Sequence, residues 1–234
     1  MSAEATSPAG IGPGPTGPAA GPVRLRITEV FFSLQGETSR VGLPTVFVRL
    51  TGCPLRCGYC DTEYAFHGGR MMDLDAVLAA VESHGARYVT VTGGEPLAQR
   101  ACLALLRALC DRGLSVSLET SGALDISGVD SRVSTILDLK TPGSGEQARN
   151  LWENLAQLDD HDEVKFVLCD EADYGWAKSM LETHAIAARC PVLFSPSFHQ
   201  LPAARLAEWI LRDRLPVRMQ VQLHKQLWGE AQGR

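Results

Sequence analysis

The 234-residue sequence lacks an apolar run long enough for a membrane span, which needs about 20 consecutive apolar residues. Its start has neither a basic cluster nor an apolar stretch, so we expect no export signal. Basic residues are also in deficit, because 22 Lys and Arg face 27 Asp and Glu, for a net charge of -5. That balance argues against a broad nucleic-acid-binding surface. We therefore expect a cytoplasmic protein that binds neither membranes nor nucleic acids.

Cysteines are few and odd in number, which argues against a disulfide framework. The seven cysteines suit the reducing environment of the cytoplasm. Residues 1–22 are mostly Gly, Pro, Ala and Ser, and such a segment buries too little apolar surface to offset the entropy lost on ordering it. We expect residues 1–22 to be a disordered tail and residues 23–234 to form a single folded domain.

Strand-like apolar runs alternate with helical patterns along the rest of the chain. The sequence predicts strands over 25–32, 45–50, 88–92, 114–119, 135–139, 163–168, 192–195 and 217–223. It predicts helices after Asp73 and over 97–111, 148–158, 172–187 and 203–212. Such alternation indicates right-handed βαβ units and a mostly parallel sheet. A complete eight-fold barrel takes about 250 residues, so we predict an α/β fold that forms a partial, open β/α barrel.

Three cysteines, Cys53, Cys57 and Cys60, form a C-x3-C-x2-C run directly after the second predicted strand. Iron–sulfur clusters are held by cysteine thiolates, normally four of them. Because a fourth nearby cysteine is missing, a [4Fe-4S] cluster here would keep one iron open to a ligand that is not protein. A structural zinc site with His67 as the fourth ligand is the plainer alternative.

Polar segments follow several of the predicted strands at their carboxyl ends. They are the cysteine loop and residues 93–96, 119–122, 140–145 and 195–197. In open α/β sheets and barrels, ligands bind beyond the carboxyl ends of the strands. This shared placement predicts one site, independently of any single motif.

Two of these segments together resemble the radical S-adenosylmethionine (radical SAM) superfamily. They are the cysteine run, with Tyr59 before its last cysteine, and the Gly93-Gly94-Glu95-Pro96 segment. Segments 32–37, 47–50, 60–62 and 222–225 further resemble the 7-carboxy-7-deazaguanine synthase family, over residues 26–228. This resemblance implies ring contraction of 6-carboxy-5,6,7,8-tetrahydropterin to 7-carboxy-7-deazaguanine with loss of ammonia, on the way to queuosine and other deazapurines.

The resemblance also implies the cofactors and the residues that hold them. Cys53, Cys57 and Cys60 would hold the [4Fe-4S] cluster, whose open iron binds S-adenosylmethionine. Reductive cleavage of that cofactor would supply the radical that takes a hydrogen from the substrate. No catalytic residue is expected beyond the cluster and the cofactor. Residues expected to contact S-adenosylmethionine are Tyr59, Asp61, Gly93, Gly94, Glu95, Thr120, Ser121, Asp138, Lys140 and Ser195. For Asp138, Lys140 and Ser195 a purely structural role is the alternative.

The substrate and a magnesium ion are assigned to further residues. Residues expected to contact the pterin are Leu34, Gln35, Gly36, Glu37, Arg49, Thr92 and His224. The Gln35–Glu37 segment offers donors and acceptors that suit a guanine-like edge, and the Arg49 fork suits the substrate carboxylate. The resemblance implies that the Thr62 hydroxyl binds Mg2+, which prefers oxygen ligands. The alternative is that Thr62 caps the turn that follows it.

Other functions remain open on sequence grounds. A glycyl-radical activating enzyme of the same superfamily would share the cysteine and glycine motifs. An electron-transfer iron–sulfur protein and a zinc-stabilised binding module are alternatives from other classes. Flavodoxin is the expected electron donor, and an open sheet edge favours a homodimer. Cys102, Cys110, Cys169 and Cys190 are expected to be small buried hydrophobes, which leaves one cluster per chain.

Overall fold

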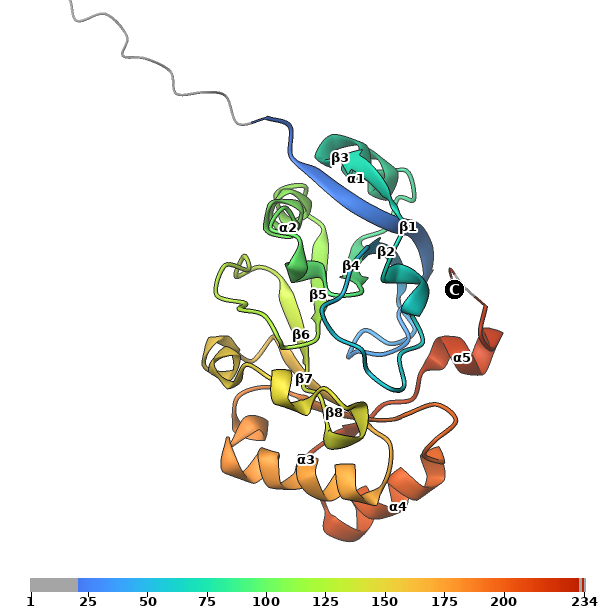
Figure 1. Ribbon diagram of the computed structural model, residues 1–234, viewed down its shortest axis with the longest axis vertical. Helices are drawn as coiled ribbons and strands as arrows, with labels where there is room; N and C mark the ends of the chain where they lie inside the picture. The colour runs from blue at the N-terminus through green and yellow to red at the C-terminus, as the bar shows by residue number, and fades with distance from the viewer. Residues whose placement is uncertain (1–20, 232, 234) are drawn as a thin grey trace, which may run out of the picture.

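The computed structural model describes residues 21–231 and 233, so nearly all of the predicted disordered tail, residues 1–22, lies outside the described residues. The described chain builds one nine-stranded sheet, in the order β3-β1-β2-β4-β5-β6-β7-β8-β9 (Figure 1). Its strands are β1 Arg24–Leu34, β2 Pro44–Leu50, β3 Arg70–Asp73, β4 Tyr88–Gly93, β5 Ser115–Thr120, β6 Ser134–Asp138, β7 Glu163–Leu168, β8 Val192–Pro196 and β9 Arg218–Met219.

The sheet is mostly parallel and open. All neighbouring pairs from β2 to β9 run parallel, whereas β1 is antiparallel to both β2 and β3. The two end strands, β3 and β9, do not pair with each other, so the barrel is incomplete. The prediction of a partial β/α barrel is therefore confirmed, although the short strand β3 was not expected.

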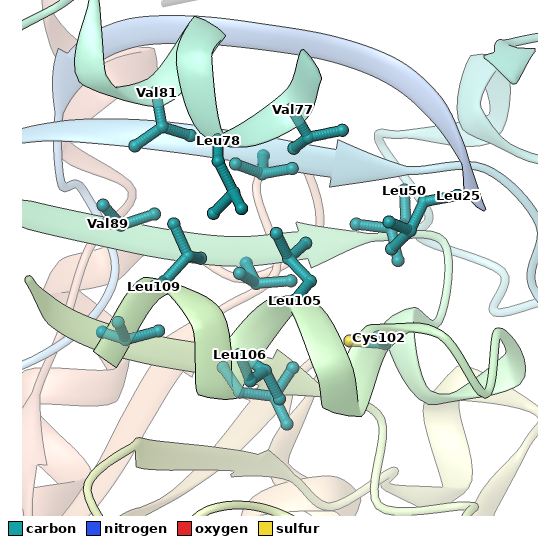
Figure 2. Close-up of a cluster of buried hydrophobic side chains, with 14 of the residues drawn as sticks. Leu25, Leu50, Val77, Leu78, Val81, Val89, Cys102, Leu105, Leu106 and Leu109 are labelled. Atoms are coloured by element: carbon teal, nitrogen blue, oxygen red, sulfur yellow. The ribbon is translucent and has the colours of Figure 1, made fainter. Parts of the chain in front are cut away.

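Helices cover the outer face of the curved sheet. They are α1 Leu74–Glu82, α2 Cys102–Asp111, α3 Glu171–Thr183 and α4 Ala203–Asp213, and a further helix, α5 Leu223–Trp228, lies apart from them. Helix α1 packs against β1, α2 against β5 and α3 against β7, whereas α5 lies on the opposite side (Figure 1). Figure 2 shows side chains of α1 and α2 directed onto the strands, such as Val77, Leu105 and Leu109 onto Val89 and its neighbours. Burying this apolar stripe fixes the helices against the sheet.

The parallel strands alternate between apolar and polar residues. Val48, Val91, Leu118, Leu137 and Val164 belong to the buried hydrophobic clusters beneath the helices. Their chain neighbours Arg49, Thr92, Glu119, Asp138 and Lys165 line a cavity on the inner face. Strands buried on both faces normally read as continuous apolar runs. The alternation with period two therefore marks the inner face as a polar site rather than a second core.

Two predicted helices differ from the structure because side chains bind the backbone instead. The helix predicted over 97–111 begins only at Cys102, since Gln99 is extended and its side chain bonds to Arg26 N, Arg26 O and Thr51 O. The helix predicted over 148–158 is two 3-10 segments, Gln147–Arg149 and Trp152–Gln157. Asn150 binds the backbone N and O of Lys140, which competes with helix formation.

The end of the chain also departs from the predicted strand over 217–223. Strand β9 covers only Arg218–Met219, and helix α5 starts at Leu223. Gln220 donates its side-chain Nε2 to Gly36 O, and Leu223 N also bonds to Gly36 O. These contacts turn the chain out of the sheet and bring α5 against the loop that follows β1.

Candidate active site

One cavity of about 510 Å³ lies at the carboxyl ends of the parallel strands, within the roughly 300–1,000 Å³ usual for ligand sites. The structure brings nearly all of the site residues predicted from the sequence into its lining. They are Leu34, Gln35, Gly36, Glu37, Arg49, Cys53, Cys57, Tyr59, Cys60, Asp61, Thr62, Thr92, Gly93, Gly94, Thr120, Ser121, Asp138, Lys140 and His224. Glu95 and Ser195 are buried and do not line the cavity.

The cysteine loop is held from three sides by hydrogen bonds. Gly52 N donates to Ala65 O at 2.8 Å, and Glu95 N donates to Gly52 O at 2.8 Å. Gly58 N donates to Ser144 O at 3.0 Å, which ties the loop to the segment after β6. Cys53, Cys57 and Cys60 are all free thiols and all half-buried in the cavity wall. A rigid loop therefore presents three thiols to one space.

The arrangement of these thiols fits a cluster better than a single ion. The Sγ atoms of Cys53, Cys57 and Cys60 do not all lie within 4.8 Å of one another, as ligands of one metal ion would. Within the described chain they also form no such group with His67, which is exposed. A cubane binds each thiolate at a different iron, so its ligands need not converge on a point. In the described chain the three cysteines and His67 thus form no compact set of four ligands, whereas three thiols in one cavity suit a [4Fe-4S] cluster.

The two glycines after β4 are required for close packing of the backbone. A Cβ on Gly94 would lie 2.3 Å from Gly52 O and 2.8 Å from Cys53 Cβ. A Cβ on Gly93 would lie 2.3 Å from Leu50 O. We expected these glycines to let the cofactor approach. The structure shows an additional demand, which is contact between their own strand end and the cysteine loop.

Replacing Gly94 by alanine is expected to separate the cysteine loop from β4. Overpacking against backbone atoms costs about 1–3 kcal/mol of stability, and the displaced thiols should hold less iron. Gly175→Ala on α3 is the control, because a Cβ there would have nothing within 4 Å and Gly175 does not line the cavity. Iron content and the thermal unfolding midpoint of anaerobically prepared protein measure the effect. Equal values for the two variants would contradict the packing explanation.

The Glu95 carboxylate is fully occupied by protein donors. It accepts hydrogen bonds from Leu97 N, Thr120 Oγ1, Ser121 N and Ser121 Oγ, at 2.6–3.0 Å. In the described structure it therefore ties β4 to the end of β5. Ser195 lies on β8 with its side chain buried outside the cavity. The expected cofactor contacts of Glu95 and Ser195 stay predictions.

Two buried polar atoms beside the cysteine loop have no partner in the described part of the chain. They are Tyr59 OH and Asp138 Oδ1. Lys140 Nζ lies 2.9 Å from Asp138 Oδ2 and 5.9 Å from the Tyr59 ring centroid. Burial alone would lower the pKa of Lys140, but Asp138 raises it well above its usual value. Orphaned polar atoms in a cavity wall call for a ligand, and hydroxyl and amino groups such as those of S-adenosylmethionine would satisfy them.

A group of buried charges forms the floor of the cavity. Lys165 Nζ contacts the Glu37 carboxylate, and Glu119 lies close to both. Burial alone would raise the pKa of Glu37, but the charge of Lys165 brings it below its ordinary value. For Glu119, burial and the negative charge of Glu37 raise the pKa. The ammonium group of Lys165 is thus the nearby positive charge for both carboxyl groups, those of Glu37 and Glu119.

Gln35 holds this floor in place instead of offering its side chain to the cavity. Its Nε2 donates to Thr90 Oγ1 and to Glu119 Oε1, both at 3.1 Å. Its Oε1 accepts from Gly36 N and Glu37 N, at 2.7 and 3.0 Å. Two donors and two lone pairs are all that the amide possesses. The Gln35 side chain therefore shapes the loop, and Glu37 and the backbone face the cavity.

The beginning of helix α5 forms part of the cavity wall. Lys225 Nζ lies 2.8 Å from Asp61 Oδ2, and Gln222 Nε2 bridges Asp61 and Glu37 at 3.1 and 2.8 Å. Burial alone would raise the pKa of Asp61, but the hydrogen bond and charge of Lys225 hold it at about 2. Ligand atoms of Glu37, Asp61 and His224 lie within 4.8 Å of one another. Both carboxylates already have a lysine partner, so this is an ion-pair network.

Several charged or amide residues of the cavity were missed as individual site residues, among them Glu119, Lys165, Gln222 and Lys225. A signal for the first two exists in the sequence, since Lys165 lies between apolar residues of a predicted buried strand and Glu119 ends another such strand directly after Leu118. Gln222 and Lys225 lie in segment 222–225, which contributed to the family resemblance. The predicted strand over 217–223 concealed their position over the cavity.

Comparison with known proteins agrees with this geometry. Residues 47–141 match the family model of the radical SAM superfamily. A 7-carboxy-7-deazaguanine synthase of Chlorobaculum tepidum is 49% identical over 208 residues, which cover 88% of this chain and 94% of that protein. A protein of the same name from Koribacter versatilis is 41% identical and covers 87% of this chain and 97% of its own length.

Solved structures share the fold. The crystal structure of QueE from Escherichia coli aligns with a TM-score of 0.70 at 24% identity, over 86% of this chain and 94% of that chain. TYW1 with a lysine-pyruvate adduct bound aligns with a TM-score of 0.56 at 12% identity, over 73% of this chain and 74% of that one. At these identities the likeness establishes the fold alone. In the described residues, no helix has the length and apolar character to cross a membrane.

Proposed function

Since the chain belongs to the 7-carboxy-7-deazaguanine synthase family of the radical SAM superfamily, we propose that it converts 6-carboxy-5,6,7,8-tetrahydropterin to 7-carboxy-7-deazaguanine with loss of ammonia. One observation carries this proposal. Three free cysteines on one loop share a cavity with the polar residues Glu37, Arg49 and His224. The first group suits the cluster, and the second suits a polar ring that bears a carboxylate.

The cofactors and the protein divide the work. When bound, the [4Fe-4S] cluster and S-adenosylmethionine supply one-electron reduction and hydrogen abstraction, which no protein side chain provides. Cys53, Cys57 and Cys60 would hold the cluster, and Tyr59 and Asp138 offer hydrogen-bonding atoms to S-adenosylmethionine. The residues of the cavity bind and orient the substrate and exclude water from it.

Recognition of the pterin is assigned to the charged floor and to Arg49. The N–H donors of the pyrimidinone edge suit the carboxylates of Glu37 and Glu119, which face the cavity. The guanidinium of Arg49 suits the substrate carboxylate as a two-pronged partner. Thr92 Oγ1 donates to Glu119 Oε2 at 3.1 Å and so orients that carboxylate.

We propose further that the Thr62 hydroxyl binds Mg2+. Thr62 precedes the 3-10 helix Glu63–Ala65, yet its side chain makes no capping hydrogen bond. Its Oγ1 donates to Asp61 Oδ1 at 2.9 Å, which leaves its lone pairs free for a metal. This absence of a cap supports the metal role over the structural alternative.

Thr62→Val is expected to abolish the dependence of activity on magnesium, because valine keeps the shape and removes the oxygen ligand. Thr62→Ser keeps the hydroxyl and should retain the dependence. Turnover is measured over a magnesium titration in chelator-treated buffer. An unchanged magnesium response in Thr62→Val would refute the ligand role.

The function itself is tested by an anaerobic assay with the carboxytetrahydropterin, S-adenosylmethionine, magnesium and a reductant. A deazaguanine product with release of ammonia, detected by mass spectrometry, is the expected result. No product from protein that carries its cluster and binds S-adenosylmethionine would overturn the proposal. Radical transfer to a partner protein would point instead to a glycyl-radical activating enzyme.

We propose that flavodoxin donates the electron and that the protein acts in the cytoplasm, where its seven free cysteines would stay reduced.

We also propose that residues 23–234 form one domain, supported by a sheet that spans the described chain. A homodimer is supported by the uncovered edge strand β3 and by exposed apolar side chains, among them Phe32 and Met71. Sedimentation of the anaerobic protein would test the dimer.

A further inference from the structure

Strand β1 contains an irregularity opposite the arginine of the cavity. Ile27 pairs with Leu50 and Glu29 pairs with Arg49, so Thr28 is an extra residue in β1. Without this bulge, Thr28 would oppose Arg49, and Glu29 would point to the other face of the sheet. Bulges often re-aim a side chain next to an active site. Here the bulge brings Glu29 to the same face as Arg49.

Glu29 contacts Arg49 from outside the cavity. Arg49 Nε donates to Glu29 Oε1 at 2.7 Å, and Tyr64 OH donates to the same oxygen at 2.9 Å. Arg49 lines the cavity, whereas Glu29 and Tyr64 do not. Both residues therefore act on the site only through the guanidinium group.

Two aromatic rings fix the plane of that group. Arg49 Cζ lies 5.6 Å from the Phe31 ring centroid and 5.7 Å from that of Tyr64. Phe31 in turn stacks on Phe47 at 4.9 Å, with the rings 9° from parallel. Within the described chain, the terminal nitrogens Nη1 and Nη2 of Arg49 have no hydrogen-bond acceptor. The guanidinium of Arg49 is thus held by the hydrogen bond of Nε and by the aromatic rings on its faces. Its terminal nitrogens Nη1 and Nη2 are left for a ligand.

The lysines of the cavity are already engaged. Lys140 pairs with Asp138, Lys165 with Glu37 and Lys225 with Asp61. Each of these ammonium groups thus already contacts a carboxylate of the protein. Arg49 can bind Glu29 and a second carboxylate at once, because its five donors point in different directions.

We propose that Glu29, supported by Tyr64, is a positioning residue that aims the free fork of Arg49 at the carboxylate of the substrate. The bulged Glu29–Arg49 pair thereby sets the preference of the cavity for carboxylated ring compounds. This inference rests on the proposed function, in which the ligand carries a carboxylate.

The test compares two ligands that differ only in that carboxylate. Affinities for 7-carboxy-7-deazaguanine and 7-deazaguanine are measured by anaerobic calorimetry, on protein that carries its cluster and S-adenosylmethionine. Glu29→Ala is expected to weaken the carboxylated ligand about tenfold, the size of one charge-assisted hydrogen bond, and to leave 7-deazaguanine unchanged. Glu29→Gln keeps an oxygen that accepts from Arg49 Nε and should hold the carboxylated ligand within about twofold.

The pair of Glu29 variants separates positioning from charge. If Glu29 only neutralised Arg49, both variants would strengthen the carboxylated ligand, and the proposal would be overturned. Equal weakening of both ligands by Glu29→Ala would indicate a merely structural role and overturn it as well. In an Arg49→Ala background, Glu29→Ala should have no further effect on the preference.

Arg49→Ala alone distinguishes this inference from the proposed function. It should remove the preference for the carboxylated ligand. Full preference in Arg49→Ala would overturn the carboxylate role of Arg49 itself, together with the positioning role of Glu29. Suppose that Arg49→Ala loses the preference for the carboxylated ligand but Glu29→Ala keeps it. That result would overturn only the positioning role of Glu29.

Discussion

Cys57→Ala is expected to leave the protein without its iron–sulfur cluster and without measurable turnover. The loop offers only three thiols, so the variant would retain two for a cluster that already has one open iron. Removing a residue that only hydrogen-bonds to a metal ligand lowers metal affinity about 10–100-fold. Removing a ligand itself should therefore lower the affinity more than about 100-fold. Iron content and the electron paramagnetic resonance signal of the reduced protein measure this directly.

Cysteines outside the cavity provide the control for this experiment. Cys110 and Cys190 are buried and lie away from the cavity lining. Cys110→Ala and Cys190→Ala should keep one cluster per chain and near-normal turnover, with a modest loss of stability. Twice that iron in the parent protein would show a second cluster, and a full cluster in Cys57→Ala would show that the cluster is bound elsewhere.

The part of the site that follows from local sequence is the part that was predicted. The cysteine run and the Gly93–Pro96 segment each lie within a few residues, and both follow strands whose β-branched patterns are clear. Parallel strands bring their carboxyl ends to one edge, so the shared site follows from the alternation of elements. The open barrel follows from the same pattern and from the chain length.

What escaped prediction depends on contacts between distant residues. The hydrogen bonds of the Gln35 amide to Thr90 and Glu119, on β4 and β5, were not foreseen, and its contact with the substrate stays a prediction. The last strand was predicted too long because Gln220 and Leu223 bond to Gly36, far away in the sequence. The helix predicted over 148–158 is wrong for a more local reason, since Asn150 binds the backbone of Lys140 in the preceding loop. Local propensity does not contain these partners.

Lys165→Met is expected to give the largest loss of stability among single changes in the cavity floor. It would leave Glu37 and Glu119 facing each other without the cation that both share. Removing one partner of a buried ion pair costs about 3–5 kcal/mol. At about 2–4 °C per kcal/mol for a chain of this size, the thermal midpoint of the anaerobic protein should fall by roughly 6–20 °C.

The pH dependence of that loss identifies its cause. In the parent protein the lowered pKa of Glu37 contributes stability above its unfolded value of 4.5, and the contribution is lost as pH falls through the folded pKa. Without Lys165, burial raises that pKa, so the variant should become more stable as pH falls from about 8 to about 5. The difference in stability between the parent and Lys165→Met should therefore become smaller as pH falls from about 8 to about 5. The control is Lys178→Met, which breaks the more exposed Lys178–Asp213 pair and should lower the thermal midpoint much less than Lys165→Met does. A deficit in Lys165→Met that is the same at both pH values would mean that lost packing, rather than stranded carboxylates, destabilises the floor.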